Sequence, residues 1–123
     1  MSTNVGLNMS HIANNNRIYD GVCNSKILQS VYDYSGYMNF GYWTDSLEAS
    51  FDFTGACDNL VDSLLELIPD KKGNILDVAC GQGATTRRLL KHYPPSDVTA
   101  INFSKRQLKL GQKNAPGCNF ILM

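Results

Sequence analysis

Residues that suit ligand binding gather in the stretch 73–86, which reads GNILDVACGQGATT. A short apolar run, 75–79, contains one acid, Asp77, and is followed by Gly81, Gly83 and a segment of helical character. A strand, a glycine turn and a helix in this order bring a ligand to the carboxyl end of a parallel strand. Because glycine lacks a Cβ, the backbone of such a turn can lie directly against the ligand.

The acid in this run separates two classes of ligand. A dinucleotide site places its pyrophosphate at a helix N-terminus, where free N–H groups and the positive end of the dipole favour an anion. Asp77 would repel a phosphate, but it suits a ligand without phosphates that carries positive charge, such as S-adenosylmethionine. The dinucleotide pattern G-x-G-x-x-G also needs glycine at position 86, where this chain has Thr86. We therefore interpret the stretch as an S-adenosylmethionine site.

The segment ILDVACGQGATT resembles motif I, hhDhGCGxG, of the class I, Rossmann-like S-adenosylmethionine-dependent methyltransferases. The resemblance covers the chain from about Tyr32 to its end. It implies an α/β fold, the N-terminal part of a doubly wound Rossmann-like sheet with three parallel strands, preceded by an aromatic lid and a cap helix. One departure is Ala79, where many members have glycine. By this resemblance, the methionine end of the cofactor contacts Asp77, Cys80, Gly81 and Gly83, and Ala79 is a further cofactor-binding residue.

A second informative segment, 31–43, reads VYDYSGYMNFGYW and contains six aromatic residues and two glycines. Aromatic side chains outside a periodic element are costly to expose, so they must cover something. They suit either an arm packed on the sheet or a lid over a ligand. The run NFGYW resembles the N-terminal lid of small-molecule methyltransferases, which implies Tyr42 and Asn39 as lid residues and Tyr37 as a further candidate.

The end of the second expected strand, 97–102, is where nucleotide folds place a side chain for the ribose hydroxyls. This chain has Asn102 there, whereas the methyltransferase family usually has an acid. An amide can still accept one hydrogen bond and donate another. The resemblance implies that Phe103 contacts the adenine. Ser104 and Gln107 form an S-x-x-Q capping box, and the resemblance also makes Gln107 a candidate ribose contact.

The remaining pattern predicts the scaffold and its division. Residues 45–68 read as one amphipathic helix that begins with a capping box of Asp45 and Glu48. A third strand is expected at 119–123. We divide the chain into an N-terminal arm and aromatic lid, 1–45, and an incomplete Rossmann-like cofactor-binding domain with its leading helix, 46–123.

Composition limits the other possibilities. The chain has 123 residues and no net charge, but residues 1–70 carry −7 and residues 71–123 carry +7. The basic half lacks interleaved aromatic residues, so we expect no nucleic-acid partner.

The four cysteines form no C-x-x-C pair and no metal site is expected. They favour reduced thiols in a cytoplasmic protein, with Cys80 a small turn residue rather than a nucleophile. No membrane partner is expected either. The Asn- and Ser-rich residues 1–16 predict a mobile leader.

The function that follows is methyl transfer from S-adenosylmethionine to a small-molecule acceptor, with this chain as the N-terminal, cofactor-binding part of an enzyme. The sequence does not identify the acceptor atom or a general base. The family sheet has seven strands and only three are expected here, so we expect the chain alone to be inactive. One alternative is a truncated, non-catalytic paralogue that pairs with itself or with a complementing chain through the third-strand edge. Another is a dinucleotide-dependent oxidoreductase.

Overall fold

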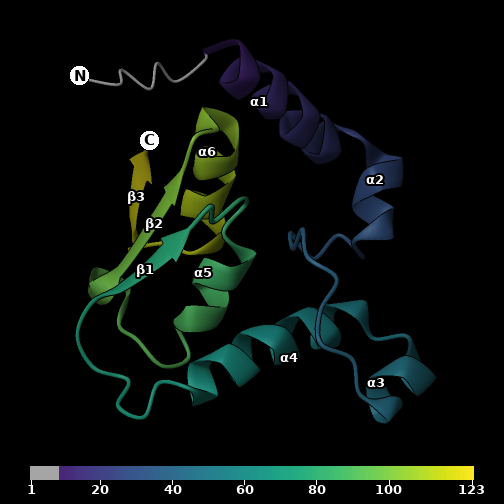
Figure 1. Cartoon of the computed structure of the whole chain (residues 1–123), viewed down its shortest axis with the longest axis vertical. Coiled ribbons are helices and arrows are strands. Elements are labelled where there is room, and N and C mark those ends of the chain that lie inside the picture. Colours follow the sequence, from purple (N-terminus) through teal and green to yellow (C-terminus); the bar gives the residue numbers. More distant parts are fainter. Residues whose placement is uncertain (1–8) are drawn as a thin grey trace, which may run out of the picture.

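In the described residues, helices precede a small parallel sheet whose strands are joined by further helices. The structure is a computed structural model and describes residues 9–123. Its elements are, in chain order, α1 (Met9–Asn24), α2 (Lys26–Val31), α3 (Asp45–Ser50), α4 (Phe53–Glu66), β1 (Ile75–Val78), α5 (Ala84–Leu89), a 3₁₀ turn (Pro95–Asp97), β2 (Val98–Asn102), α6 (Lys105–Asn114) and β3 (Asn119–Leu122) (Figure 1).

The three strands form one parallel sheet in the order β1-β2-β3. Ile75 of β1 is paired with Val98 of β2, and Thr99 of β2 is paired with Asn119 of β3. Helices α5 and α6 lie between successive strands in the chain, because parallel neighbours need a crossover connection. The predicted α/β class with three parallel strands is therefore confirmed.

The core lies mainly between α4, α5 and one face of the sheet. Its members are buried apolar side chains that α4 presents at helical spacing, together with side chains from α5, β2 and the segment before α3. They are Tyr37, Cys57, Val61, Leu65, Ala84, Leu89, Tyr93 and Val98. A smaller cluster of Cys80, Ala100 and Leu108 packs beneath α6, against Phe120 of β3.

The opposite face of the sheet exposes apolar side chains. Leu76 and Val78 of β1 are 54% and 61% exposed, and Ile121 of β3 is 45% exposed. The pairing of Val78 with Ile101, and of Ile101 with Ile121, places these three residues in one row across the sheet, with Leu76 two residues before Val78 on the same face. In Figure 1, α5 and α6 lie on the other side of the strands, so no helix of residues 9–123 covers this row.

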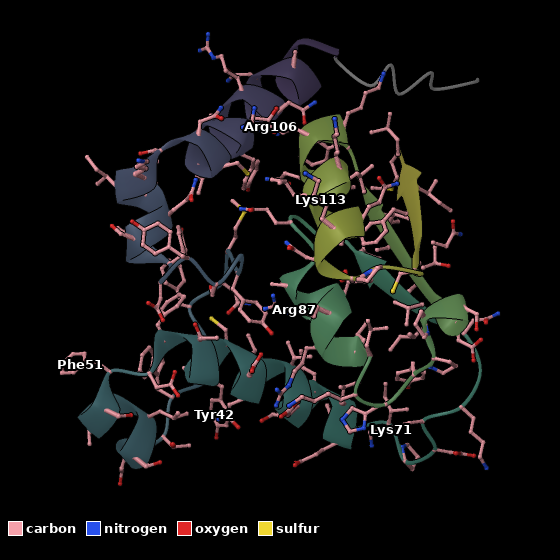
Figure 2. All side chains as sticks on the ribbon, turned by 180° about the vertical axis from the view of Figure 1, so that it is seen from behind. Tyr42, Phe51, Lys71, Arg87, Arg106 and Lys113 are labelled. Atoms are coloured by element: carbon pink, nitrogen blue, oxygen red, sulfur yellow. The ribbon has the colours of Figure 1, made fainter. Side chains whose placement is uncertain are left out.

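The single helix predicted over 45–68 is wrong, because two helices occupy this segment. Phe51 has a positive φ of 51° and closes α3, and the Asp52 side chain accepts a 2.8 Å hydrogen bond from the Gly55 N–H to begin α4. Phe51 is 88% exposed and projects from the tip of the molecule (Figure 2). The buried stripe that suggested one helix begins only at α4.

Two further local expectations need correction. The capping box of Asp45 and Glu48 does not form, because Thr44 is the N-cap residue of α3 and makes no side-chain capping bond. Residues 9–16 belong to helix α1 rather than to a mobile leader, and residues 1–8 lie outside the described part of the chain. No helix in residues 9–123 combines the length and the apolar character that a membrane span needs.

Candidate functional site

The glycine turn after β1 is built on left-handed backbone. Ala79, Gly81 and Gly83 have φ angles of 59°, 53° and 80°. The N–H of Cys80 donates a 3.1 Å hydrogen bond to the carbonyl of Ile101 in β2, which holds the turn against the carboxyl end of the neighbouring strand. The turn therefore lies at the sheet edge where open α/β folds bind their ligands.

A cavity of about 280 Å³ opens beside this turn. Seven of the side chains or backbone segments predicted for the site line it: Asn39, Ala79, Cys80, Gly81, Asn102, Phe103 and Gln107. Within the described residues, no Asp, Glu, Lys, Arg or His lines this cavity. The structure thus brings three separated parts of the sequence to one uncharged site.

Other residues of the cavity wall were not assigned from the sequence. They come from α1, from the segment before α3 and from the start of α5: Tyr19, Gly36, Met38, Ala84 and Thr85, together with Tyr37, the further lid candidate. Tyr19 also packs edge-to-face on Phe103, with ring centroids 6.3 Å apart. The sequence could have predicted α1, because Tyr19, Val22 and Cys23 are spaced so that they share one face of a helix.

Tyr42 lies away from the cavity. Its side chain is 55% exposed, and Figure 2 shows it beside α4, on the side away from α1 and α6. Its backbone is held by α4, because the Tyr42 N–H donates to the Ala56 carbonyl at 2.8 Å and Asn59 Nδ2 donates to the Tyr42 carbonyl at 2.8 Å. Within the aromatic segment, Tyr37 and Asn39 face the cavity and Tyr42 does not.

The two glycines of the turn have different surroundings. A Cβ on Gly81 would lie 3.9 Å from Met38 Sδ and 4.0 Å from Gln107 Oε1, at the cavity. A Cβ on Gly83 would lie 2.8 Å from the Gly111 Cα, at the contact of α5 with α6. Gly83 does not line the cavity, so its role in this structure is helix packing.

Asp77 lies on the half-buried face of β1, outside the residues that line the cavity. Its Oδ2 accepts a 2.6 Å hydrogen bond from the Thr86 hydroxyl, and Thr86 is fully buried. Burial raises the pKa of Asp77, and the Thr86 bond opposes that rise. The residue that breaks the dinucleotide pattern at position 86 is therefore the partner of the acid, and the proposed ammonium contact stays a prediction.

Asn102 and Gln107 form a buried amide pair at the cavity. Asn102 Nδ2 donates to Gln107 Oε1 at 2.7 Å, and Asn102 Oδ1 accepts from the Phe103 N–H at 2.9 Å. Among the residues that the structure describes, Gln107 Nε2 donates only to sulfur atoms, Cys23 Sγ at 3.8 Å and Met38 Sδ at 3.7 Å. Sulfur is a weak acceptor, so this N–H group remains a good donor for a ligand oxygen.

Only half of the predicted S-x-x-Q capping box is present. The Ser104 hydroxyl accepts from the Gln107 N–H at 3.1 Å and begins α6. The Gln107 side chain does not return to the helix start, because it lies among Asn102, Cys23 and Met38 at the cavity. Its orientation agrees with the ligand-facing alternative.

The thiol in the turn is in its neutral form at physiological pH. Burial, and then the charge of Asp77, raise the pKa of Cys80 to about 12. A thiol becomes a nucleophile as its thiolate, so Cys80 lacks the activation that a catalytic cysteine needs. In the part of the chain that the structure describes, no three His, Cys, Asp or Glu side chains form a metal-binding group.

Known proteins with similar sequences are methyltransferases. Residues 75–123 match the family described as "Methyltransferase domain". The malonyl-[acyl-carrier protein] O-methyltransferase of Halalkalibacterium halodurans is 35% identical over 65 residues, which are 50% of this chain and 24% of that protein. The trans-aconitate 2-methyltransferase of Rhodopseudomonas palustris is 33% identical over 60 residues, which are 49% of this chain and 23% of that protein.

A solved structure matches most of the fold. The crystal structure of the [4+2]-cyclase SpnF superimposes with a TM-score of 0.69 at 25% sequence identity, and covers 88% of this chain and 40% of that one. The chain thus matches about a quarter of the length of the two curated relatives and less than half of the solved structure. Together with the parallel sheet, these matches show that residues 75–123 are similar to a methyltransferase domain and that the chain has a Rossmann-like α/β fold.

Proposed function

We propose that this chain binds S-adenosylmethionine and forms the cofactor-binding part of an enzyme that transfers a methyl group to a small molecule. The observation that carries the proposal is the uncharged cavity in which the turn 79–81 meets the Asn102–Gln107 amide pair. A site at the carboxyl ends of adjacent parallel strands is where nucleoside-containing ligands bind in this architecture.

The residues present fit this cofactor. Gly81 leaves open the space that a Cβ would take at the cavity, so ligand atoms can approach the turn. Asn102 and the weakly satisfied Gln107 amide would hold ribose hydroxyls. Phe103, supported by Tyr19, offers an aromatic edge or face to adenine. When bound, S-adenosylmethionine supplies an electrophilic methyl group on a sulfonium.

The methionine end would lie at the turn, close to Asp77. The carboxylate carries one hydrogen bond, from Thr86 to Oδ2, so Oδ1 is available to an ammonium group. Burial raises the pKa of Asp77, and carboxylates whose pKa is perturbed in this way are typical of functional sites. The aromatic and apolar wall of the cavity would exclude water around the sulfonium, which favours a reaction that disperses charge.

A small-molecule acceptor is supported by the relative named for trans-aconitate. The other relative is named for a malonyl group on acyl-carrier protein, so an acceptor delivered by a carrier protein is the alternative within the same chemistry. The neighbour in the structural comparison is named a [4+2]-cyclase, and one fold can support different reactions. A non-catalytic module that pairs with another chain is favoured by one observation, the exposed apolar row of the sheet.

Cytoplasmic location is part of the proposal. All four cysteines are free thiols in the structure, and three of them are buried. Free thiols persist in reducing compartments.

Isothermal titration calorimetry tests the cofactor. We expect the chain to bind S-adenosylhomocysteine saturably but weakly, because the sheet of residues 9–123 has three strands whereas the resemblance implies seven, and to give no heat with NADH. Binding of NADH without binding of S-adenosylhomocysteine would overturn the assignment in favour of an oxidoreductase. Transfer of a radiolabelled methyl group, assayed with trans-aconitate, malonate and a malonyl carrier protein, tests the reaction. We expect no turnover by the chain alone.

A further inference from the structure

One wall of the cavity is tied to two helices by a row of polar side chains. Tyr37 lines the cavity and is only 2% exposed, and its hydroxyl donates a 2.5 Å hydrogen bond to Asp58 Oδ1. Asp58 lies in α4, 21 residues further along the chain. Burial and the Asp58 carboxylate raise the pKa of Tyr37, so the phenol keeps its proton and remains a donor.

The same carboxylate is held by an arginine of α5. Arg88 Nη1 donates to Asp58 Oδ2 at 2.9 Å, while Arg88 Nε and Nη2 donate to the two oxygens of Asp62. A guanidinium is planar and rigid, so binding two carboxylates fixes its plane and both acids. The Arg88 side chain is 16% exposed, against 29% for Asp58 and 36% for Asp62. The pair with Asp58 is therefore the better shielded one.

This arrangement connects two parts of the cavity lining that lie far apart in the sequence. Tyr37 belongs to the wall 36–39, in the segment that lies beside α4 in Figure 1. Arg88 belongs to α5, whose first two residues, Ala84 and Thr85, line the cavity directly after the glycine turn. Asp58 bonds to both residues, so its two oxygens set the position of the wall relative to the turn.

The wall depends on this tie because it has little regular structure of its own. Residues 36–39 belong to no helix or strand, and Gly36 has a φ of 81°. Its other described side-chain hydrogen bonds are of two kinds. Two are local, from the Tyr37 N–H to Ser35 Oγ and from the Gly41 N–H to Asn39 Oδ1. The other two reach more distant elements and involve sulfur, from Cys57 Sγ to the Asn39 carbonyl at 3.8 Å and from Gln107 Nε2 to Met38 Sδ at 3.7 Å. A charge-assisted bond is about twice as strong as a neutral one, and sulfur bonds are weaker still.

We propose that Tyr37, Asp58 and Arg88 act together as positioning residues that hold the wall 36–39 at the distance from the glycine turn that the cofactor needs. The proposal rests on the proposed function for its ligand and goes beyond it by assigning three residues that motif I does not contain. It also makes α4, which carries Asp58, part of the binding apparatus rather than scaffold alone.

The test compares two conservative variants. Tyr37→Phe removes only the hydroxyl and keeps the ring, so it breaks the bond to Asp58 with little change of volume. Asp62→Asn is the matched control, because it weakens the other arm of Arg88 and leaves the Tyr37–Asp58 bond in place. Two quantities are measured: affinity for S-adenosylhomocysteine by calorimetry, and deuterium uptake of peptides covering 35–41 and 53–66 by mass spectrometry.

We expect Tyr37→Phe to weaken binding by about tenfold, the effect of losing one hydrogen bond to a charged acceptor. Deuterium uptake should rise in 35–41 and stay unchanged in 53–66. Asp62→Asn should lower the urea midpoint of unfolding but change the affinity and the uptake of 35–41 much less than Tyr37→Phe does, because Arg88 Nη1 still donates to Asp58. Wild-type affinity or wild-type uptake of 35–41 in Tyr37→Phe would overturn the proposal.

Equal losses of affinity in both variants would also overturn it, because a general loss of stability would then explain the effect. Failure of the wild-type chain to bind S-adenosylhomocysteine would contradict the proposed function instead. In that case the deuterium uptake of 35–41 still decides whether the Tyr37 hydroxyl holds the wall.

Discussion

Replacing Ala79 by glycine is expected to stabilise this fold, although the change removes side-chain atoms. Ala79 has a φ of 59° at the first position of the glycine turn, in the left-handed region that disfavours residues with a Cβ. Many methyltransferases whose motif I this turn resembles have glycine there. The strain lies at the candidate site itself, since Ala79 lines the cavity.

The size of the effect follows from two opposing contributions. An L-residue in the left-handed conformation is strained by about 1–2 kcal/mol relative to glycine. Glycine loses more backbone freedom on folding, which offsets about 0.5–1 kcal/mol. Ala79 is exposed, so removal of its methyl group leaves no buried void. The net expectation for Ala79→Gly is a gain of about 0.5–1 kcal/mol in the free energy of unfolding.

Urea unfolding followed by far-ultraviolet circular dichroism measures this gain. Ala84→Gly is the control, because Ala84 is in the first turn of α5 and 3% exposed, so the same substitution removes a buried methyl group from a helix. It should destabilise by about 1 kcal/mol or more. An Ala79→Gly chain with the same midpoint as wild type, or a lower one, at unchanged urea dependence would refute the strain argument.

Three other substitutions test separate parts of the structure. Gly83→Ala should lower the free energy of unfolding by about 2–3 kcal/mol, since it combines a φ of 80° with a Cβ placed 2.8 Å from the Gly111 Cα. Gly73→Ala is its control and should lower the free energy of unfolding by about 1 kcal/mol, because Gly73 has a similar φ but its Cβ would meet nothing within 4 Å. Equal losses in the two variants would contradict the packing role of Gly83. Ile121→Lys should reduce self-association through the exposed row of the sheet, and an unchanged sedimentation-velocity profile would show that this row is not the contact. Asp77→Asn should weaken S-adenosylhomocysteine binding by about 1.5–3 kcal/mol. Burial raises the pKa of Asp77 above its ordinary 3.8, so the stability of the wild type should fall as pH rises through the folded-state pKa. Urea midpoints measured from about pH 3.5 to 7 show this fall, and Asp77→Asn should remove the contribution of Asp77 to it.

The local features of this chain were predictable because neighbouring residues determine them. The apolar run 75–79, the glycines after it and the β-branched run before Asn102 gave strands within one residue of those observed. The Ser104 cap was predictable too, because its bond to the Gln107 N–H spans only three residues. Both features depend on contacts within one element or one turn.

Features that depend on tertiary contacts were not predictable in the same way. The aromatic segment has no periodicity, so its composition could not show that Tyr37 faces the cavity while Tyr42 faces solvent. That choice is made by α4, through the bond of Tyr37 to Asp58 and the backbone bond of Tyr42 to Ala56. The break at Phe51 escaped detection because acids and apolar residues still alternate at helical spacing across it.

Motif I combines two physical requirements that the sequence alone does not separate. Gly81 and Gly83 are two residues apart and both have positive φ, but a Cβ on the first would point at the cavity and a Cβ on the second would meet the backbone of α6. Thr86 meets a further requirement, because its buried hydroxyl donates a hydrogen bond to Asp77, the acid of the motif. A motif of this kind records both how the ligand is held and how the helix after it packs. Its match indicates a resemblance to the methyltransferase family, while the geometry shows which of its residues line the cavity.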